Sequence, residues 1–207
     1  MPYQRLQAPA SSPVTVDEAR AWCRIPDSSD DAQLSMLIGA ATLAAETKTR
    51  RALVNQQWRL ILDSFPGPSL IWVPYGKTYG IPAHAIQIHK CPVVSIDVIR
   101  YQDMAGVWQT VDPSVYKSDL SSEPARITPV FGRIWPINRP EIGSVQVDFT
   151  AGYGAAADVP EGLKHWIAMR VSTMYEMREE VAVMSRGTVQ ELPYVDSLLD
   201  PYLVAEF

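Results

Sequence analysis

The chain has 207 residues, with 18 basic and 23 acidic side chains, a formal net charge of −5 and 47% hydrophobic residues. This composition is typical of a globular protein with a hydrophobic core, and the length fits one domain or one domain with a sizeable insertion. No apolar run reaches the roughly 20 residues that cross a bilayer, and the acidic balance disfavours a protein that grips DNA by neutralising its phosphates.

The N-terminal segment, residues 1–13, contains three prolines and two serines. We expect an extended arm here that reaches away from the fold rather than packing onto it. Residues 1–12 also lack the apolar stretch of a signal peptide.

Two helices are predicted after the arm. Thr15 and Glu18 form a capping box, in which the Thr15 hydroxyl accepts from the Glu18 amide and the Glu18 carboxylate accepts from the Thr15 amide. The short helix that begins there must end before Pro26. The acidic turn 27–31 then caps a longer helix, whose apolar residues recur at three- and four-residue steps: Leu34, Leu37, Ile38, Ala41 and Ala45. We expect an antiparallel helix pair over residues 14–54.

From about Asn55 the apolar residues recur with a period of two. After a strand that begins near Trp58, further strands are expected at 70–73, 85–90, 94–101, 108–111, 115–117, 126–129 and 144–150. The turn 103–106 is typical of a hairpin with glycine in the left-handed conformation. Short strands with a Pro- or Gly-bearing turn about every ten residues predict an antiparallel β insertion over residues 55–157.

Helix returns over residues 158–186, where Pro160 fits the first helical turn. Its apolar stripe is broad enough to pack on the first two helices. The tail, residues 187–207, has no Lys or Arg, and its apolar patches at 192–195 and 197–202 have little local structure to bury them. The predicted class is therefore α+β: a small bundle of N- and C-terminal helices with an inserted antiparallel β domain and an extended C-terminal tail.

One motif resembles a cofactor site. Residues 152–157, Gly-Tyr-Gly-Ala-Ala-Ala, satisfy the G-x-G-x-x-A dinucleotide fingerprint. However, the strand before them alternates instead of being apolar throughout, and residues 158–160 separate the glycines from the start of the helix. We interpret the motif as a strand-to-helix turn, and no cofactor is expected.

Candidate metal ligands and nucleophiles are few. His89 and Cys91 share one face of a predicted strand, with His84 nearby, but His165 and Cys23 lie in predicted helices. A structural zinc site needs four ligands in closed geometry, so no metal is expected. No G-x-S-x-G or phosphate-loop motif occurs, and no catalytic residue is predicted. Two cysteines are too few for a disulfide framework and fit a reducing compartment.

The order of these features resembles the head–tail connector (adaptor) proteins of long-tailed bacteriophages, in the longer form with a β insertion that is also found in gene transfer agents. The matching segments run through almost the whole chain: 13–19, 27–31, 51–58, 92–96, 148–154, 159–161, 175–179, 192–194 and 198–202. One residue departs from the family pattern, because Arg50 stands where the family usually has a glycine that ends the second helix. A longer or differently closed helix is therefore expected there in place of a left-handed end.

The resemblance implies a structural virion protein in the neck, made in the host cytoplasm, that forms a ring of about twelve copies beneath the portal protein. Such a ring extends the channel through which genomic DNA passes without sequence-specific binding, and it carries the stopper or tail-completion protein. An acidic protein suits such a conduit because negative walls let the duplex slide. The tail is the candidate portal-docking segment, with an apolar set of anchors: Leu192, Tyr194, Leu198, Leu199 and Tyr202. No membrane contact is expected.

Two other functions remain open from the sequence. The chain could be another neck or tail-completion protein of the virion, although the order of helix pair, β insertion and helix disfavours this. It could also be a tail-associated enzyme such as a hydrolase. An enzyme would require a pocket of convergent titratable groups with shifted pKa values, and the sequence offers no basis for one.

Overall fold

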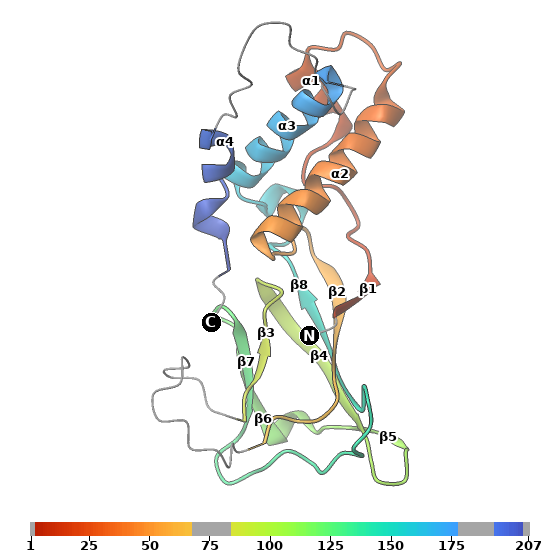
Figure 1. Ribbon diagram of the computed structural model, residues 1–207, viewed down its shortest axis with the longest axis vertical. Helices are drawn as coiled ribbons and strands as arrows, with labels where there is room; N and C mark the ends of the chain where they lie inside the picture. The colour runs from red at the N-terminus through yellow and green to blue at the C-terminus, as the bar shows by residue number, and fades with distance from the viewer. Residues whose placement is uncertain (1–2, 68–83, 178–192, 205–207) are drawn as a thin grey trace, which may run out of the picture. The chain divides into compact units, whose positions relative to one another are not determined.

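The computed structural model describes residues 3–67, 84–177 and 193–204, with only the backbone at 193 and 194. Its helices and antiparallel sheets confirm the predicted α+β class (Figure 1). The chain divides into two compact units. We call residues 10–54 and 153–203 the helical unit, and residues 1–9, 55–152 and 204–207 the β unit. The predicted strand at 70–73 lies outside the described residues.

The helical unit is built on three helices that pack against one another in every pairing: α1 (Val16–Cys23), α2 (Asp31–Thr49) and α3 (Glu161–Glu176) (Figure 1). A short helix α4 (Pro193–Ser197) and two 3₁₀ turns (Ala156–Asp158 and Asp200–Tyr202) complete it. The core joins all three long helices through fully buried side chains, among them Ala19, Leu34, Ile38, Leu163 and Trp166. The last ten residues of the predicted third helix, 177–186, are not helical at 177 and otherwise lie outside the described residues.

Both ends of α1 are closed by local hydrogen bonds. At the start, the Thr15 amide donates to Glu18 Oε2 at 2.7 Å and the Glu18 amide donates to Thr15 Oγ1 at 3.2 Å, so the predicted capping box is confirmed. At the end, Arg24 adopts the left-handed conformation with φ 57°. Its amide bonds the carbonyl of Ala21, and the next amide bonds that of Arg20, which is the hydrogen-bond pattern of a Schellman motif.

The prediction for the end of α2 is wrong. Arg50 takes the left-handed conformation, with φ 59° and ψ 23°, even though it is not glycine. A left-handed non-glycine residue costs about 1–2 kcal/mol, and the burial of Leu53 after the turn offsets this cost. Leu53 becomes fully buried, and its amide donates to the buried carboxylate of Glu46 at 2.9 Å. Sharp chain reversal at this point is therefore more favourable than a longer helix.

The described residues of the β unit form two antiparallel sheets. The larger has the order β1-β2-β8-β4-β5, with β1 at Tyr3–Gln7, β2 at Gln56–Leu62, β8 at Val145–Ala151, β4 at Val93–Gln102 and β5 at Trp108–Thr110. The smaller has the order β3-β7-β6, with β3 at Ile86–Ile88, β7 at Ala125–Pro129 and β6 at Tyr116–Asp119. The predicted hairpin turn is confirmed, because Gly106 has φ 83° and Asp103 accepts hydrogen bonds from the amides of Ala105 and Val107.

The expected extended arm requires a correction at residues 3–7. They form the edge strand β1 and pair with β2, where Tyr3 lies opposite Leu60. The Tyr3 ring packs edge-on against Phe149, and its hydroxyl accepts from the His89 amide at 2.9 Å. The prolines of this segment flank Tyr3–Gln7 without interrupting it, so every amide of the strand remains able to pair.

The tail also packs, which corrects the expectation that its apolar patches lack a place to be buried. Leu199 is only 2% exposed and belongs to the core of the helical unit. The carbonyl of Tyr202 accepts from Arg51 Nε at 2.6 Å, and Asp196 accepts from the indole of Trp166 at 3.0 Å. These polar contacts to α3 and to the segment after α2 fix residues 195–203, a long-range arrangement that local sequence patterns do not encode.

Candidate interaction sites

The glycine-rich motif at 152–157 is a turn, as interpreted from the sequence. Gly152 and Gly154 have φ 144° and 131°, which favour glycine. The carboxylate of Asp158 accepts from the Ala155 amide at 2.8 Å, and a side chain at position 154 would collide with that carboxylate. An acidic group therefore occupies the space in front of the motif, where a pyrophosphate would be repelled.

An ion pair between Arg59 and Asp148 joins two neighbouring strands, β2 and β8. Asp148 lies buried on the larger sheet and accepts two hydrogen bonds from Arg59, at 2.6 and 2.8 Å, which raises the pKa of the arginine. Burial raises the pKa of the Cys23 thiol, which makes it a weaker nucleophile. In the described ranges, no three His, Cys, Asp or Glu side chains gather as metal ligands would. None of the described helices has the length and apolar character to span a membrane.

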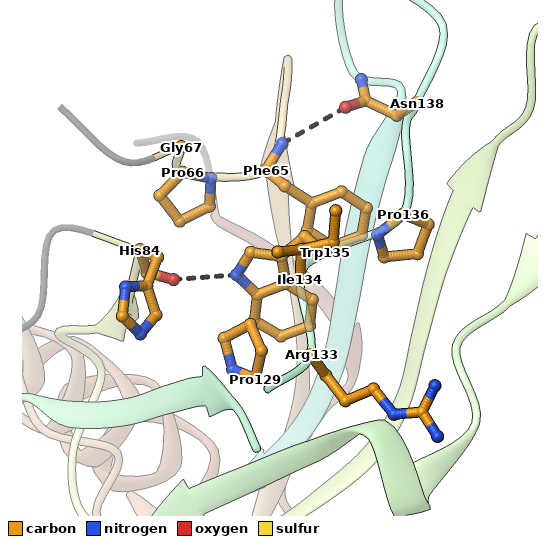
Figure 2. A pocket seen from close by; sticks show the side chains of 10 residues that line it. All are labelled: Phe65, Pro66, Gly67, His84, Pro129, Arg133, Ile134, Trp135, Pro136 and Asn138. Carbon is orange, nitrogen blue, oxygen red and sulfur yellow. Dashed lines mark hydrogen bonds between the residues drawn. The ribbon is translucent and has the colours of Figure 1, made fainter. Parts of the chain in front are cut away.

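A pocket of about 510 Å³ opens in the β unit (Figure 2). Phe65 and Trp135 stack at a ring distance of 4.9 Å with an interplanar angle of 8°, and the Trp135 indole donates to the His84 carbonyl at 2.8 Å. The rest of the lining is mostly proline and aliphatic: Pro66, Gly67, Pro129, Arg133, Ile134, Pro136 and Asn138. Among the described residues its ionisable groups are one imidazole and one guanidinium, and the apolar lining suits an apolar side chain of a partner.

A second apolar feature adjoins the pocket. We call residues 131–142 the apolar loop; it has no regular secondary structure and bears four strongly exposed aliphatic or aromatic side chains: Phe131, Ile134, Ile137 and Ile142. Ile134 and Trp135 also line the pocket, so the two features form one surface (Figure 2). Arg139 pairs with Glu141 at 2.7 Å, whereas Arg133 has no ion-pair partner among the described residues. Clusters of exposed apolar side chains of this kind mark interaction sites.

Sequence reasoning missed this surface, although a signal was present. Gly132, Pro136, Pro140 and Gly143 interrupt the apolar stretch. Two prolines within this twelve-residue loop prevent a continuous strand, and without a strand the isoleucines have no regular face on which to be buried. The combination of frequent chain breakers and large apolar side chains therefore indicates an exposed loop.

The five predicted portal-binding residues are not all brought together. Leu192 lies outside the described residues, and the side chain of Tyr194 is not described. Leu198 and Tyr202 are half-buried against the helical core, and Leu199 lies inside it. Leu199 is thus held by its own subunit, while Leu198 and Tyr202 keep part of their surface accessible.

The chain is similar in sequence to one protein family and in fold to several solved structures. Residues 13–88 match the family model described as phage gp6-like head-tail connector protein. No curated protein matches the chain. Among solved structures, a chain in the neck of an empty gene transfer agent (GTA) particle with C6 symmetry and a chain in the virion of a native GTA particle each have a TM-score of 0.76 and 22% identity. A chain in the neck of a native GTA particle with C12 symmetry has a TM-score of 0.73 and 23% identity.

Each of these three matches covers 100% of this chain and 97% of the other. The fold is therefore shared with those proteins over the entire length, β unit included. The family model covers α1, α2, β2 and β3, and it confirms the resemblance to the head–tail connector family that the sequence indicates.

Proposed function

We propose that this protein is a structural head–tail connector of the virion neck. The observation that carries the proposal is the combination of two matches: the connector family model over residues 13–88 and the fold of GTA neck chains over all 207 residues. The buried ion pairs and the apolar pocket favour a structural role over a catalytic one.

The connector forms a ring, of about twelve copies, that extends the DNA channel beneath the portal protein. The C12 symmetry of a neck with a similar chain supports this number. The charge distribution supports a conduit, because the helical unit has nine basic and fourteen acidic side chains, a net charge of −5. Acidic surfaces repel the phosphate backbone and allow DNA to slide without sequence-specific contact.

Residues 193–203 form the portal-docking segment, with Leu198 and Tyr202 as its accessible anchors. Leu199 fixes the segment to its own subunit, and Lys48 holds it further through an ion pair with Asp196 at 2.7 Å. A segment that is already ordered loses less conformational entropy on binding than a disordered tail would. Leu192 and Tyr194 are further portal contacts in the same proposal.

The apolar loop and its pocket form the platform for the next protein of the neck, a stopper or tail-completion protein. Phe131 and Ile142 provide fully exposed anchors, and the pocket beside Trp135 accepts an apolar side chain in return. The Arg133 guanidinium has no ion-pair partner among the described residues. Its charge therefore favours a partner protein that places a carboxylate next to the apolar side chain it inserts.

Deletion of the gene tests the neck role. We expect particles whose heads contain DNA but carry no tails in electron micrographs, and restoration of tails by the wild-type protein supplied in trans. Complete, infectious or gene-transferring particles without this chain would contradict the proposal.

Substitution in the apolar loop tests the platform. The double variant Phe131→Asp and Ile142→Asp should still be found in DNA-filled heads but should yield far fewer tailed particles. The matched control is Met104→Asp, because Met104 is also strongly exposed in the β unit but lies in the β4–β5 turn. Equal tail counts for the double variant and the control would overturn this assignment.

A further inference from the structure

The outer face of α2 lacks charge to an unusual degree. Between Asp31 and Glu46 the helix contains no ionisable side chain, and Glu46 itself is buried. Met36 and Leu43, two turns apart, are 68% and 61% exposed although they belong to the largest helix of the unit. Large exposed apolar side chains on an uncharged helix face mark a surface that another protein covers.

Gly39 lies between these two exposed side chains. A methyl group added at Gly39 would meet no described atom of its own chain within 4 Å. Glycine in a helix interior costs up to about 1 kcal/mol relative to alanine, and nothing in the subunit requires it. Together with Ala40, it forms a shallow notch flanked by Met36 and Leu43, a shape that allows a second surface to approach the helix backbone.

The opposite side of the helical unit carries a hollow. It has a volume of about 190 Å³ and lies between α1 and α3, with Val14 and Ala168 buried. The other lining residues are Trp22 and four ionisable side chains: Glu18, Glu161, Lys164 and His165. Trp22, almost half exposed, stands at its rim with its ring edge-on to His165 at 5.0 Å. Because α1, α2 and α3 all pack on one another, the groove between α1 and α3 faces away from α2.

We propose that the α2 face of one copy packs into the α1–α3 hollow of the next copy of this chain. A ring needs two different patches on opposite sides of each subunit, because head-to-tail contacts close only if each copy offers both. The helical unit has one uncharged face on α2 and, facing away from it, one hollow in which Val14 and Ala168 are surrounded by charged and aromatic side chains. Apolar contacts inside a polar rim are the usual arrangement of an interface. The hollow is large enough for a Met or Leu side chain. This inference rests on the proposed connector role and assigns its ring contact.

Disulfide cross-linking in assembled particles tests which faces meet. The double variant Leu43→Cys and His165→Cys should give a ladder of covalent oligomers on oxidation, because one cysteine lies on each proposed face. The wild type controls for Cys23 and Cys91. Neither single variant should give more than the wild type. Dimers from Leu43→Cys alone would mean that α2 packs on α2 and would overturn the head-to-tail assignment, as would the absence of a ladder.

Charge insertion provides a second, independent test. Leu43→Glu should weaken self-association of the purified protein, measured by native mass spectrometry, at least about tenfold, because a charge must then be buried at the contact. Gly39→Ala should weaken it less while leaving subunit unfolding unchanged or slightly more stable. Met104→Glu, which changes a similarly exposed apolar side chain in the β4–β5 turn, should have no effect.

The outcomes separate this inference from the proposed function. If Leu43→Glu assembles like the wild type, the α2 contact is wrong while the neck role stands. If Leu43→Glu and Met104→Glu weaken assembly equally, the α2 contact is also wrong, because the effect is then one of added charge. If the wild-type chain is absent from particle necks, both proposals fail.

Discussion

The two units of this molecule use their apolar side chains differently. The helical unit closes its own core, even recruiting Leu199 from the tail, and keeps an excess of acidic charge at its surface. The β unit has nine basic and nine acidic side chains and so no net charge, and it leaves Phe131 and Ile142 in solvent. The units therefore differ in charge and in where apolar side chains are exposed: on helix α2, at Met36 and Leu43, in the acidic unit, and in the apolar loop in the uncharged one.

The two units also differ in which residue types adopt a positive φ. The two described non-glycine residues with positive φ, Arg24 and Arg50, belong to the helical unit, whereas the turns of the β unit use glycine at 106, 132 and 143. In the helical unit the cost of these conformations is offset by the core that follows each turn. In the β unit no such offset is needed.

Truncation of the central aromatic residue of each core should have the largest effect. Trp166→Ala in the helical unit and Phe149→Ala in the β unit should each cost about 3–5 kcal/mol of unfolding free energy, because both side chains are fully buried. Hydrogen exchange measured by mass spectrometry should locate the loss of protection in the substituted unit. An equal loss of protection in both units from either substitution would show that the two units do not have separate cores.

The tail provides the next test. Leu199→Ala should cost about 2–4 kcal/mol, because Leu199 lies in the helical core. Its neighbour Leu198 is half-buried, so Leu198→Ala should cost only about 1 kcal/mol or less while reducing capture by portal-bearing heads. Urea unfolding and a head-binding assay measure the two effects. Equal stabilities for the two variants would show that the tail does not belong to the helical unit.

A smaller, stabilising effect is expected at the end of α1. Arg24→Gly should raise the unfolding free energy by about 1 kcal/mol, because glycine adopts the left-handed conformation without the clash of Cβ. Arg24→Ala is the matched control: it removes the guanidinium but keeps Cβ, and no comparable gain is expected. A gain of the same size in both variants would assign the effect to charge instead of backbone conformation.

The smallest effect is a dependence on pH. A hydrogen bond from Lys48, together with one from Trp166, lowers the pKa of Asp196 below its ordinary value. The stabilisation is therefore present above the unfolded pKa, near 3.9, and is lost as the pH falls through the lower folded pKa. It should stay below about 1 kcal/mol, because the Asp196 side chain is 55% exposed and its ion pair is screened.

Unfolding at pH 7 and at pH 3, for the wild type and Asp196→Asn, measures this contribution. The variant should show a weaker decline in stability on acidification. A decline identical to that of the wild type would show that the Asp196 carboxylate does not help to hold the tail.

Local signals in the sequence predict much of this fold. Thr15 and Glu18 are three residues apart, and the turn at Gly106 joins adjacent strands, so short-range chemistry determines both. The pairing of Tyr3 with Leu60 and the burial of Leu199 depend on residues more than fifty positions away, which periodicity does not encode. The pocket beside Trp135 depends in the same way on His84, from a distant segment.

The most direct test of the connector role is the location and copy number of this chain in purified particles. Quantitative mass spectrometry with antibody labelling in electron micrographs would measure both. The account predicts about twelve copies per particle, confined to the neck between head and tail. A copy number in the hundreds along the tail or over the head, or a chain missing from tailed particles, would contradict it.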